Sequence, residues 1–312
     1  MNAQPPVDVV TGAFGFTGSR IAERLLAAGH GVRTISRRPA GAHPLAGRVD
    51  VQPYGLERPS ELRDQLDGAG TLYITYWIRF PRDGVTFEPV VENVRRLVAA
   101  AAGAGLRRVI YISVSNAAHD ASTAYFRAKA QAEDAVRAAG ISYAIIRPTL
   151  LYGEGDILIN NMAWTLRRLP LFGIPGDGTY RVQPVYVDDV ADLAIELGLG
   201  LDDGAAEVDA AGVEVFSFND LVELVARAVG SRSRLIHLPP SVVLASTRLM
   251  GLAVRDVVLT RDEITELMES LLVSRFDATR PTRFSEWLET RGETLGRRYA
   301  SELARNFRLS PG

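Results

Sequence analysis

The stretch VDVVTGAFGFTGSRIAERLLAAGHGVRTIS, residues 7–36, decides the fold class of this chain of 312 residues. An apolar, β-rich run at Val7–Thr11 leads directly into a loop of three glycines, and a helical pattern follows. The apolar residues on one face of that helix are Ile21, Ala22, Leu25 and Leu26. The pattern ends at Gly29, a natural helix stop, and a second apolar run covers Val32–Ser36. This order predicts a strand–helix–strand unit.

The loop in this stretch has a G-x-x-G-x-x-G spacing. We expect Gly12 to permit a tight turn, Gly15 to let the backbone approach a pyrophosphate, and Gly18 to allow close helix–strand packing. A helix that begins at Ser19 would present free N–H groups and its positive dipole end to the phosphates. The residues expected to contact a dinucleotide here are Gly12, Phe14, Gly15, Phe16, Thr17 and Gly18.

Apolar runs continue to alternate with helical patterns as far as Arg147. The further strands predicted are Val49–Gln52, Thr71–Thr75, Val109–Ser113 and Tyr143–Arg147. The helices predicted between them are Pro59–Leu66, Glu88–Ala102 and Thr123–Ala139. This alternation is typical of an α/β protein with a Rossmann doubly wound parallel sheet.

The alternation loosens in the second half of the chain. Tyr152–Thr179 is rich in Gly, Pro and aromatic residues, and its end, PLFGIPGDGTY (170–180), favours loop and turn. Arg181–Val187 predicts a strand and Asp188–Gly198 a helix, and from Ser217 onwards the pattern is mostly helical.

We therefore divide the chain into two parts. Residues 1–150 form a dinucleotide-binding Rossmann domain, whose sheet is completed by residues 181–215. Residues 151–312 form a smaller, mainly helical part that is interleaved with the sheet and caps its carboxyl edge over the substrate.

The composition excludes several other classes of protein. The net charge of -2 argues against a nucleic-acid or anionic-membrane partner, and no apolar run approaches a membrane span of about 18 residues. Cysteine is absent, which excludes disulfides and thiolate catalysis. The four histidines have no ligand spacing, so we expect no metal site. The N-terminus lacks a secretory signal, so we expect a cytoplasmic protein, while the oligomeric state stays open.

The end of the second predicted strand bears on the choice between NAD and NADP. An NAD site usually has an acidic residue there, which accepts hydrogen bonds from the ribose hydroxyls. This chain has Arg37 and Arg38 instead. Guanidinium groups bind a 2′-phosphate through charge-assisted hydrogen bonds, whereas a carboxylate repels it. We therefore expect NADP(H), the alternative being that both arginines are simply solvated.

Tyr125 and Lys129 are four residues apart in a predicted helix, which places them on one face, one turn apart. Lys129 is the only lysine among the 35 Lys and Arg residues of the chain. A neighbouring ammonium favours the phenolate form of a tyrosine and eases proton transfer to and from a substrate oxygen. A lysine can also donate to the nicotinamide ribose. The pair therefore indicates acid–base chemistry.

Six segments carry a resemblance to a known family: TGAFGFTG (11–18), VENV (91–94), VIYISVSN (109–116), YFRAK (125–129), RPTLLYGEGD (147–156) and VQPVYVDDVADL (182–193). The chain resembles the short-chain dehydrogenase/reductase superfamily in its extended or atypical branch. Within that branch it is similar to the NmrA-like group and to proteins like the accessory subunit of respiratory complex I. The last third of the chain matches only loosely.

The resemblance implies further site residues. A Ser or Thr near the end of the fifth strand hydrogen-bonds the substrate carbonyl in this superfamily; Ser115 fits that role best and Ser113 second. Pro148 follows the sixth strand, where the backbone comes close to the nicotinamide, and Leu56 lies where a residue contacts adenine. Ser115 precedes Tyr125 by only ten residues. That shortening is typical of atypical members, some of which bind the cofactor without known catalysis.

Aromatic residues complete the predicted site. Tyr76, Trp77 and Phe80 follow the fourth strand and, with Trp164 and Phe172, either wall an apolar substrate pocket or pack in the core. The favoured function is an NADP(H)-dependent oxidoreductase acting on a carbonyl or alcohol of an apolar small molecule. The alternatives are a non-catalytic NADP(H)-binding sensor or assembly protein, and a nucleotide-sugar epimerase or dehydratase.

Overall fold

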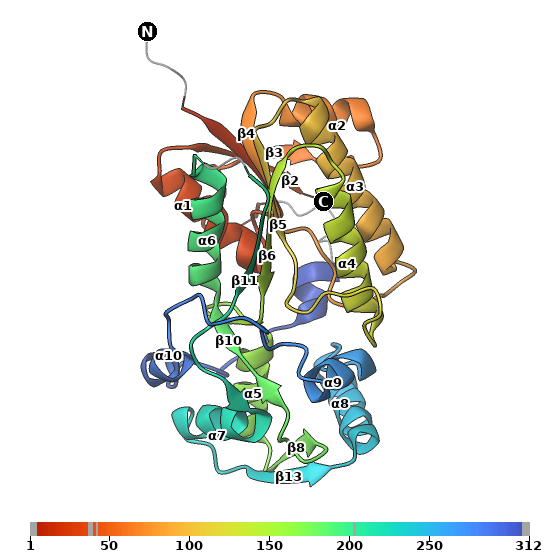
Figure 1. Cartoon of the computed structure of the whole chain (residues 1–312). Coiled ribbons are helices and arrows are strands. Elements are labelled where there is room, and N and C mark those ends of the chain that lie inside the picture. Colours follow the sequence, from red (N-terminus) through yellow and green to blue (C-terminus); the bar gives the residue numbers. More distant parts are fainter. Residues whose placement is uncertain (1–4, 37–39, 42, 202–203, 308–312) are drawn as a thin grey trace. The chain divides into compact units, whose positions relative to one another are not determined.

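The computed structural model describes residues 5–307, except residues 37–39, 42 and 202–203. Contacts within the chain divide it into two units (Figure 1). The first comprises Met1–Pro148 and Val187–Ala210, and the second comprises Thr149–Tyr186 and Ala211–Gly312. The chain therefore leaves the first unit, returns to it once, and ends in the second.

The first unit is built on one seven-stranded sheet in the order β11-β6-β5-β4-β1-β2-β3. Its strands are β1 (Val7–Thr11), β2 (Gly31–Ser36), β3 (Asp50–Pro53), β4 (Ala69–Ile74), β5 (Arg108–Ile112), β6 (Ser142–Pro148) and β11 (Ala206–Ala210). Every pairing in the sheet is parallel. The chain winds outwards from β1 to β3 and then crosses to β4 on the other side, which is the doubly wound arrangement. The predicted fold class is confirmed.

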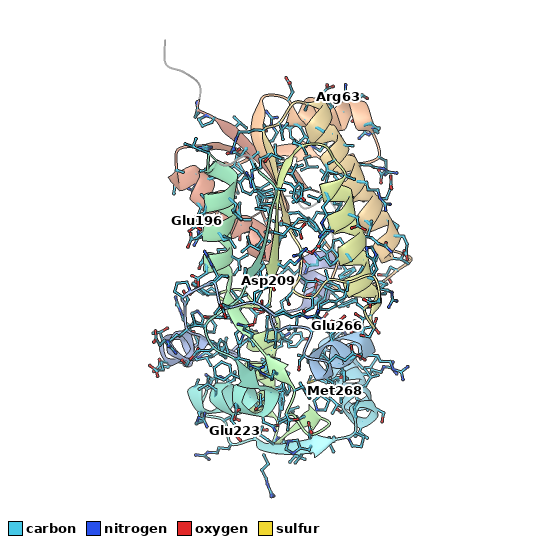
Figure 2. All side chains as sticks on the ribbon, in the orientation of Figure 1. Arg63, Glu196, Asp209, Glu223, Glu266 and Met268 are labelled. Carbon is cyan, nitrogen blue, oxygen red and sulfur yellow. The ribbon has the colours of Figure 1, made fainter. Side chains whose placement is uncertain are left out.

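Helices cover both faces of this sheet (Figure 1). On one face lie α1 (Phe16–Ala27) and α6 (Val187–Leu199), which pack together, and on the other lie α2 (Pro59–Leu66), α3 (Phe87–Gly103) and α4 (Ala124–Arg137). Figure 2 shows Glu196 of α6 and Arg63 of α2 on opposite sides of the unit. Because both faces are covered, a central strand such as β5 is buried along its whole length.

Helix α1 begins at Phe16, so the predicted start at Ser19 is wrong. The backbone N–H of Gly15 donates to the carbonyl of Gly12 at 2.7 Å, and this tight turn allows the helix to begin directly after Gly15. The predicted apolar stripe is otherwise present, since Ile21, Ala22 and Leu25 are all buried.

The second unit combines short strand pairs with helices. The paired strands are β7 (Leu150–Tyr152) with β10 (Pro184–Tyr186), β8 (Leu171–Pro175) with β13 (Arg234–Leu238), and β9 (Arg181–Val182) with β12 (Phe216–Ser217). The helices are α5 (Leu158–Arg168), α7 (Phe218–Ala228), α8 (Pro240–Val254), α9 (Arg261–Met268), α10 (Phe284–Arg291) and the π-helix η1 (Leu303–Phe307). A separate apolar core, which includes Tyr152, Phe218 and Phe284, holds this unit together.

Two predictions in this unit need correction. The segment expected to be loop and turn contains β8, because a partner strand distant in sequence, β13, supplies its hydrogen bonds. The single strand expected at Arg181–Val187 is divided into β9 and β10. Gln183 separates them, since its backbone N–H donates to the carbonyl of Leu272 and its side-chain amide to that of Gly212.

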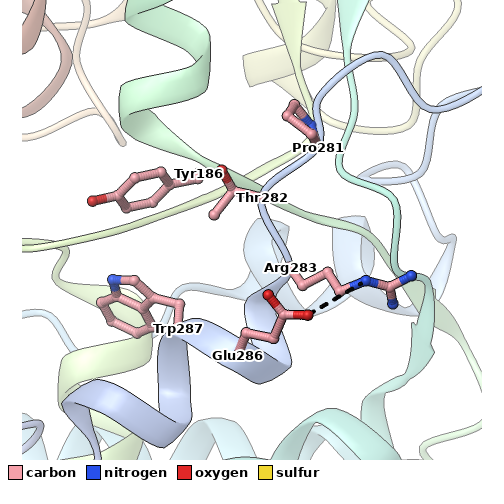
Figure 3. Close-up of a pocket in the computed structure, with 6 residues that line it drawn as sticks. All are labelled: Tyr186, Pro281, Thr282, Arg283, Glu286 and Trp287. Carbon is pink, nitrogen blue, oxygen red and sulfur yellow. Dashed lines mark ion pairs between the residues drawn. The ribbon is translucent and has the colours of Figure 1, made fainter.

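A pocket of about 380 Å³ opens on the second unit (Figure 3). Tyr186 and Trp287 form its aromatic walls, and the ion pair of Arg283 with Glu286 lies beside them. None of the residues predicted to be catalytic or to bind the cofactor lines this pocket.

Candidate functional site

The glycine loop lies at the carboxyl end of β1 and is fixed by neighbouring strands. Gly12 adopts φ +71°, a conformation that favours glycine. A Cβ on Gly18 would lie 2.3 Å from the carbonyl oxygen of Gly12, so a side chain at Gly18 does not fit. The hydroxyl of Thr75, just beyond β4, donates to the carbonyl of Thr11 at 2.5 Å and joins the loop to the next strand.

These features fit a dinucleotide pyrophosphate. The N-cap of α1 is Gly15, which has no side chain to accept hydrogen bonds from the first-turn N–H groups. Phe16, Thr17 and Gly18 provide that first turn, and a helix N-terminus with exposed N–H groups binds phosphate. The structure thus places these predicted residues around one loop, together with Phe14, whose buried ring lies 5.3 Å from that of His43.

The ends of β5 and β6 lie side by side at the same edge of the sheet. Beyond the last paired residues, the backbone N–H of Ser113 donates to Ile146 O at 2.7 Å, and that of Ser115 donates to Pro148 O at 2.9 Å. The strand order β6-β5-β4-β1 brings this edge next to the glycine loop through β4. The predicted Ser113, Ser115 and Pro148 are therefore neighbours at the carboxyl edge, where ligands bind in open α/β sheets.

Tyr125 and Lys129 both lie on α4, which packs on β5 and β6. The Nζ of Lys129 donates to Ile112 O, the last residue of β5, at 2.9 Å. Nζ also lies 4.0 Å from the centre of the Trp77 ring, and Tyr125 meets the same ring edge-on at 6.1 Å. Burial lowers the pKa of Lys129 to about 7, while the charge of Glu133 acts in the opposite direction.

Glu133 is a buried carboxylate one turn beyond Lys129 on α4. It accepts hydrogen bonds from the hydroxyl of Ser113 at 2.6 Å, from Arg147 at 2.7 and 2.9 Å, and from Arg137 at 2.8 Å. These contacts tie the ends of β5 and β6 to the helix that carries the Tyr–Lys pair. They also engage the Ser113 hydroxyl as a donor.

The remaining predicted residues either pack among apolar side chains or fall outside the residues that the structure describes. Leu56, expected beside adenine, is only 2% exposed and belongs to the apolar core of the first unit. Arg37 and Arg38 lie outside the described residues. Trp164 and Phe172 belong to the second unit, where Trp164 packs edge-on against Tyr299 and Phe172 packs against the core.

Two site residues were missed by sequence reasoning. No motif in the sequence marks Glu133, because its partners Ser113 and Arg147 lie far from it in the sequence. Asn93 belongs to the VENV segment, and its side chain donates to the hydroxyls of Tyr76 at 3.2 Å and Tyr54 at 3.4 Å. Asn93 thereby holds the segment after β4 against α3. The VENV motif could have indicated this role from the sequence.

The described residues contain neither a cluster of metal ligands nor a membrane-spanning helix. No group of three or more His, Asp or Glu side chains within them is arranged to hold a metal ion. In the same part of the chain, no helix has the length and apolar character needed to cross a membrane.

A family model described as NAD(P)H-binding matches residues 12–170. The chain belongs to this NAD(P)H-binding family. The match covers the glycine loop, the ends of β4, β5 and β6, and the Tyr–Lys pair, so the whole candidate site lies within the family's domain. A nicotinamide cofactor is therefore the ligand of this fold.

Two curated proteins are similar to the chain over most of its length. The chain is 28% identical over 246 residues to ceramide reductase of Caulobacter vibrioides, covering 78% of this chain and 77% of that protein. It is 26% identical over 287 residues to the mitochondrial NADH dehydrogenase [ubiquinone] 1 alpha subcomplex subunit 9 of Arabidopsis thaliana, covering 86% and 71%.

Among solved structures, an NADPH-dependent quinone oxidoreductase of Escherichia coli has the same fold. Its TM-score is 0.71 at 18% identity, over 91% of this chain and 98% of that one. At this identity the likeness shows the fold alone. The family model shows that the chain is an NAD(P)H-binding protein, and one of its relatives is named a reductase.

Proposed function

We propose that this protein is an NADP(H)-dependent oxidoreductase acting on a carbonyl or alcohol of an apolar small molecule. The observation that carries the proposal is the position of Tyr125 and Lys129. They lie one turn apart on α4, with Nζ bonded to the end of β5, at the sheet edge that also holds the glycine loop. The bound nicotinamide would supply or accept a hydride at the substrate carbon.

The residues of the chain would handle the proton and the substrate oxygen. Tyr125 exchanges a proton with that oxygen, and Ser115 donates a hydrogen bond to it. The ammonium of Lys129 favours the phenolate of Tyr125 through its charge, an effect that needs no direct contact. The Trp77 ring lies over Nζ, 4.0 Å from it, beside the Tyr–Lys pair.

The proposed cofactor is NADP(H) rather than NAD(H). Support comes from Arg37 and Arg38, which follow β2 in the sequence, at positions where an NAD site usually has a carboxylate. A charge-assisted contact to the 2′-phosphate contributes roughly 1.5–3 kcal/mol, or about one to two decades in affinity.

The apolar substrate is supported by the side chains around the Tyr–Lys pair. Trp77 and Phe87 contact the Tyr125 ring, and Tyr76 and Ile78 pack on the same core. Such surfaces suit apolar ligands with a single polar group. One relative is named ceramide reductase, and ceramide is a lipid with long apolar chains.

A second candidate is a non-catalytic NADP(H)-binding protein. The observation that favours it is the burial of Lys129, which is 3% exposed and already bonded to Ile112. The complex I subunit relative is consistent with such a role.

One set of measurements separates these functions. NADPH oxidation is followed against a panel of apolar ketones, aldehydes and enones. Tyr125→Phe should keep NADPH binding and lower turnover about 10²–10⁴-fold, because it removes only the proton donor. Tyr143→Phe on β6 is the matched control and should leave turnover unchanged.

Three results would contradict the proposal. Parental turnover in Tyr125→Phe would remove the proton-donor role. Tight NADPH binding without turnover of any panel member would favour the non-catalytic candidate. Equal dissociation constants for NADPH and NADH would refute the assigned cofactor.

A further inference from the structure

The side chain of Lys129 ends among aromatic rings. Its Nζ lies 4.0 Å from the centre of the Trp77 ring and 5.1 Å from that of Tyr111, and it donates one hydrogen bond, to Ile112 O. We propose that Trp77 is a positioning residue, whose ring keeps Lys129 in its ammonium form one turn from Tyr125. The role in catalysis rests on the proposed function, but the contact itself does not.

Burial makes such help necessary. A lysine 3% exposed loses most of the hydration of its ammonium, so the neutral amine is favoured. The carboxylate nearest along the helix, Glu133, forms its ion pairs with Arg137 at 2.8 Å and Arg147 at 2.7 Å. Its negative charge is therefore largely shared with two guanidinium groups. Beyond the carbonyl of Ile112, which accepts the hydrogen bond from Nζ at 2.9 Å, the Trp77 face is the closest remaining source of negative potential.

The groups that face Lys129 come from several elements. They are Tyr125 and Glu133 on α4, Tyr111 on β5, Trp77 after β4, and, behind Glu133, Arg147 on β6 and Arg137 on α4. Burial raises the pKa of the Tyr111 phenol well above its usual value, so this group stays neutral and offers its ring rather than a charge. Glu133 is thus the nearby anion and Trp77 the nearest aromatic face.

Trp77 is held in this position by its own packing. Its ring stacks on Phe87 at 6.3 Å with an interplanar angle of 18°, and Tyr125 meets it edge-on at 84°. The indole Nε1 is buried and has no hydrogen-bond partner among the described residues, so stacking rather than hydrogen bonding fixes the ring. The negative face of an indole attracts a cation more strongly than that of phenylalanine. One ring therefore contacts both members of the Tyr–Lys pair.

The chain offers an unusually direct test, because Lys129 is its only lysine. Protein labelled with ¹³C at lysine Cε gives one side-chain lysine signal, whose titration with pH reports the protonation of Lys129 alone. The parent should titrate near pH 7, where burial places the pKa of Lys129. In Trp77→Leu the midpoint should fall by about one pH unit, since the loss of a desolvated cation–π contact disfavours the ammonium.

Matched variants guard against a simple folding defect. Trp77→Phe keeps an aromatic face and should give a midpoint between those of the parent and Trp77→Leu. Trp164→Leu removes a tryptophan of the second unit and should leave the midpoint unchanged. If Trp77→Leu does not fold, fluorinated tryptophan, which keeps the shape but weakens the negative ring face, should lower the midpoint instead. Identical midpoints in the parent and in the folded Trp77 variant or fluorinated protein would overturn the inference.

The rate–pH profile tests the link to catalysis. If catalysis uses the ammonium, turnover falls as pH rises through the titration midpoint of Lys129. In Trp77→Leu this alkaline fall in turnover should move to lower pH, by the same shift that the ¹³C titration shows for the midpoint. A lower titration midpoint for Lys129 together with an unchanged rate–pH profile would overturn the positioning role. Absence of turnover in the parent would instead refute the proposed function, and the spectra would still decide whether Trp77 sustains the charge.

Discussion

Glu207 on β11 is bonded to two arginines of the neighbouring elements. It accepts hydrogen bonds from Arg137 at 2.7 Å and from Arg147 at 2.5 Å, and these contacts lower its pKa to about 2. The same arginines also contact Glu133, so one network joins α4, β6 and β11. A carboxylate bound this way stabilises the folded state only while it is ionised.

This predicts a defined pH dependence of stability. The contribution of Glu207 is fully present above its ordinary pKa of 4.5 and is lost as pH falls towards about 2, because the folded protein must then protonate a paired carboxylate. Thermal unfolding should show a difference between the parent and Glu207→Gln that is largest above pH 4.5 and shrinks on acidification. A difference that grows in acid would contradict the assignment.

Glu61→Gln is the matched control for this measurement. It removes an exposed ion pair with Arg58 at the start of α2. Exposed pairs contribute about 0–1 kcal/mol, so little effect is expected at any pH.

At the scale of one element, the N-terminus of α1 depends on two glycines for different reasons. At Gly18 the backbone leaves no room for a side chain, since a Cβ there would lie 2.3 Å from Gly12 O. At Gly15 the corresponding distance is 3.1 Å, which is tight but less severe. The need for glycine at Gly15 therefore rests mainly on the approach of a pyrophosphate.

Gly18→Ala should consequently damage the loop itself. We expect destabilisation of about 1–3 kcal/mol, as for other overpacked buried sites, together with weaker binding of NADPH. Gly103→Ala in α3 is the control, because there the nearest atoms belong to the movable guanidinium of Arg63 at 3.2 Å. Chemical denaturation measures both variants. Parental stability in Gly18→Ala would show that the loop adopts another conformation.

At the scale of the whole molecule, the first unit needs a segment that returns late in the chain. β11 pairs with β6 over five residues, and α6 covers α1, where Arg24 bonds to Asp188 at 3.0 Å and also to Asp192. Without residues 187–210, the sheet edge at β6 and the part of β4, β5 and β6 on which α6 packs would both be exposed to water.

A fragment of residues 1–148 should therefore aggregate or remain largely unfolded. Joining residues 187–210 to it through a flexible linker should restore a folded unit, because the missing strand and helix are then supplied. Circular dichroism and size-exclusion chromatography check both polypeptides. A stable, monomeric fragment 1–148 would mean that β11 and α6 are dispensable.

The alternation of apolar runs and helical patterns predicted the first unit closely, and α2 matches its predicted range of Pro59–Leu66. These features are encoded locally: a helical stripe or a β-rich run depends on residues within one or two turns. The glycine loop and the Tyr125–Lys129 spacing belong to the same class, because each motif is contiguous.

Other features depend on contacts between distant segments, and only the tertiary structure decided them. β8 exists through its pairing with β13, and Glu133 becomes the centre of a network only when β5, β6 and β11 are brought together. The contact of Trp77 with Lys129 joins a segment after β4 to a helix after β5. The sequence by itself determined the fold class and the cofactor loop, whereas the surroundings of the lysine came from the folded chain, because burial and charge are set by neighbours in space.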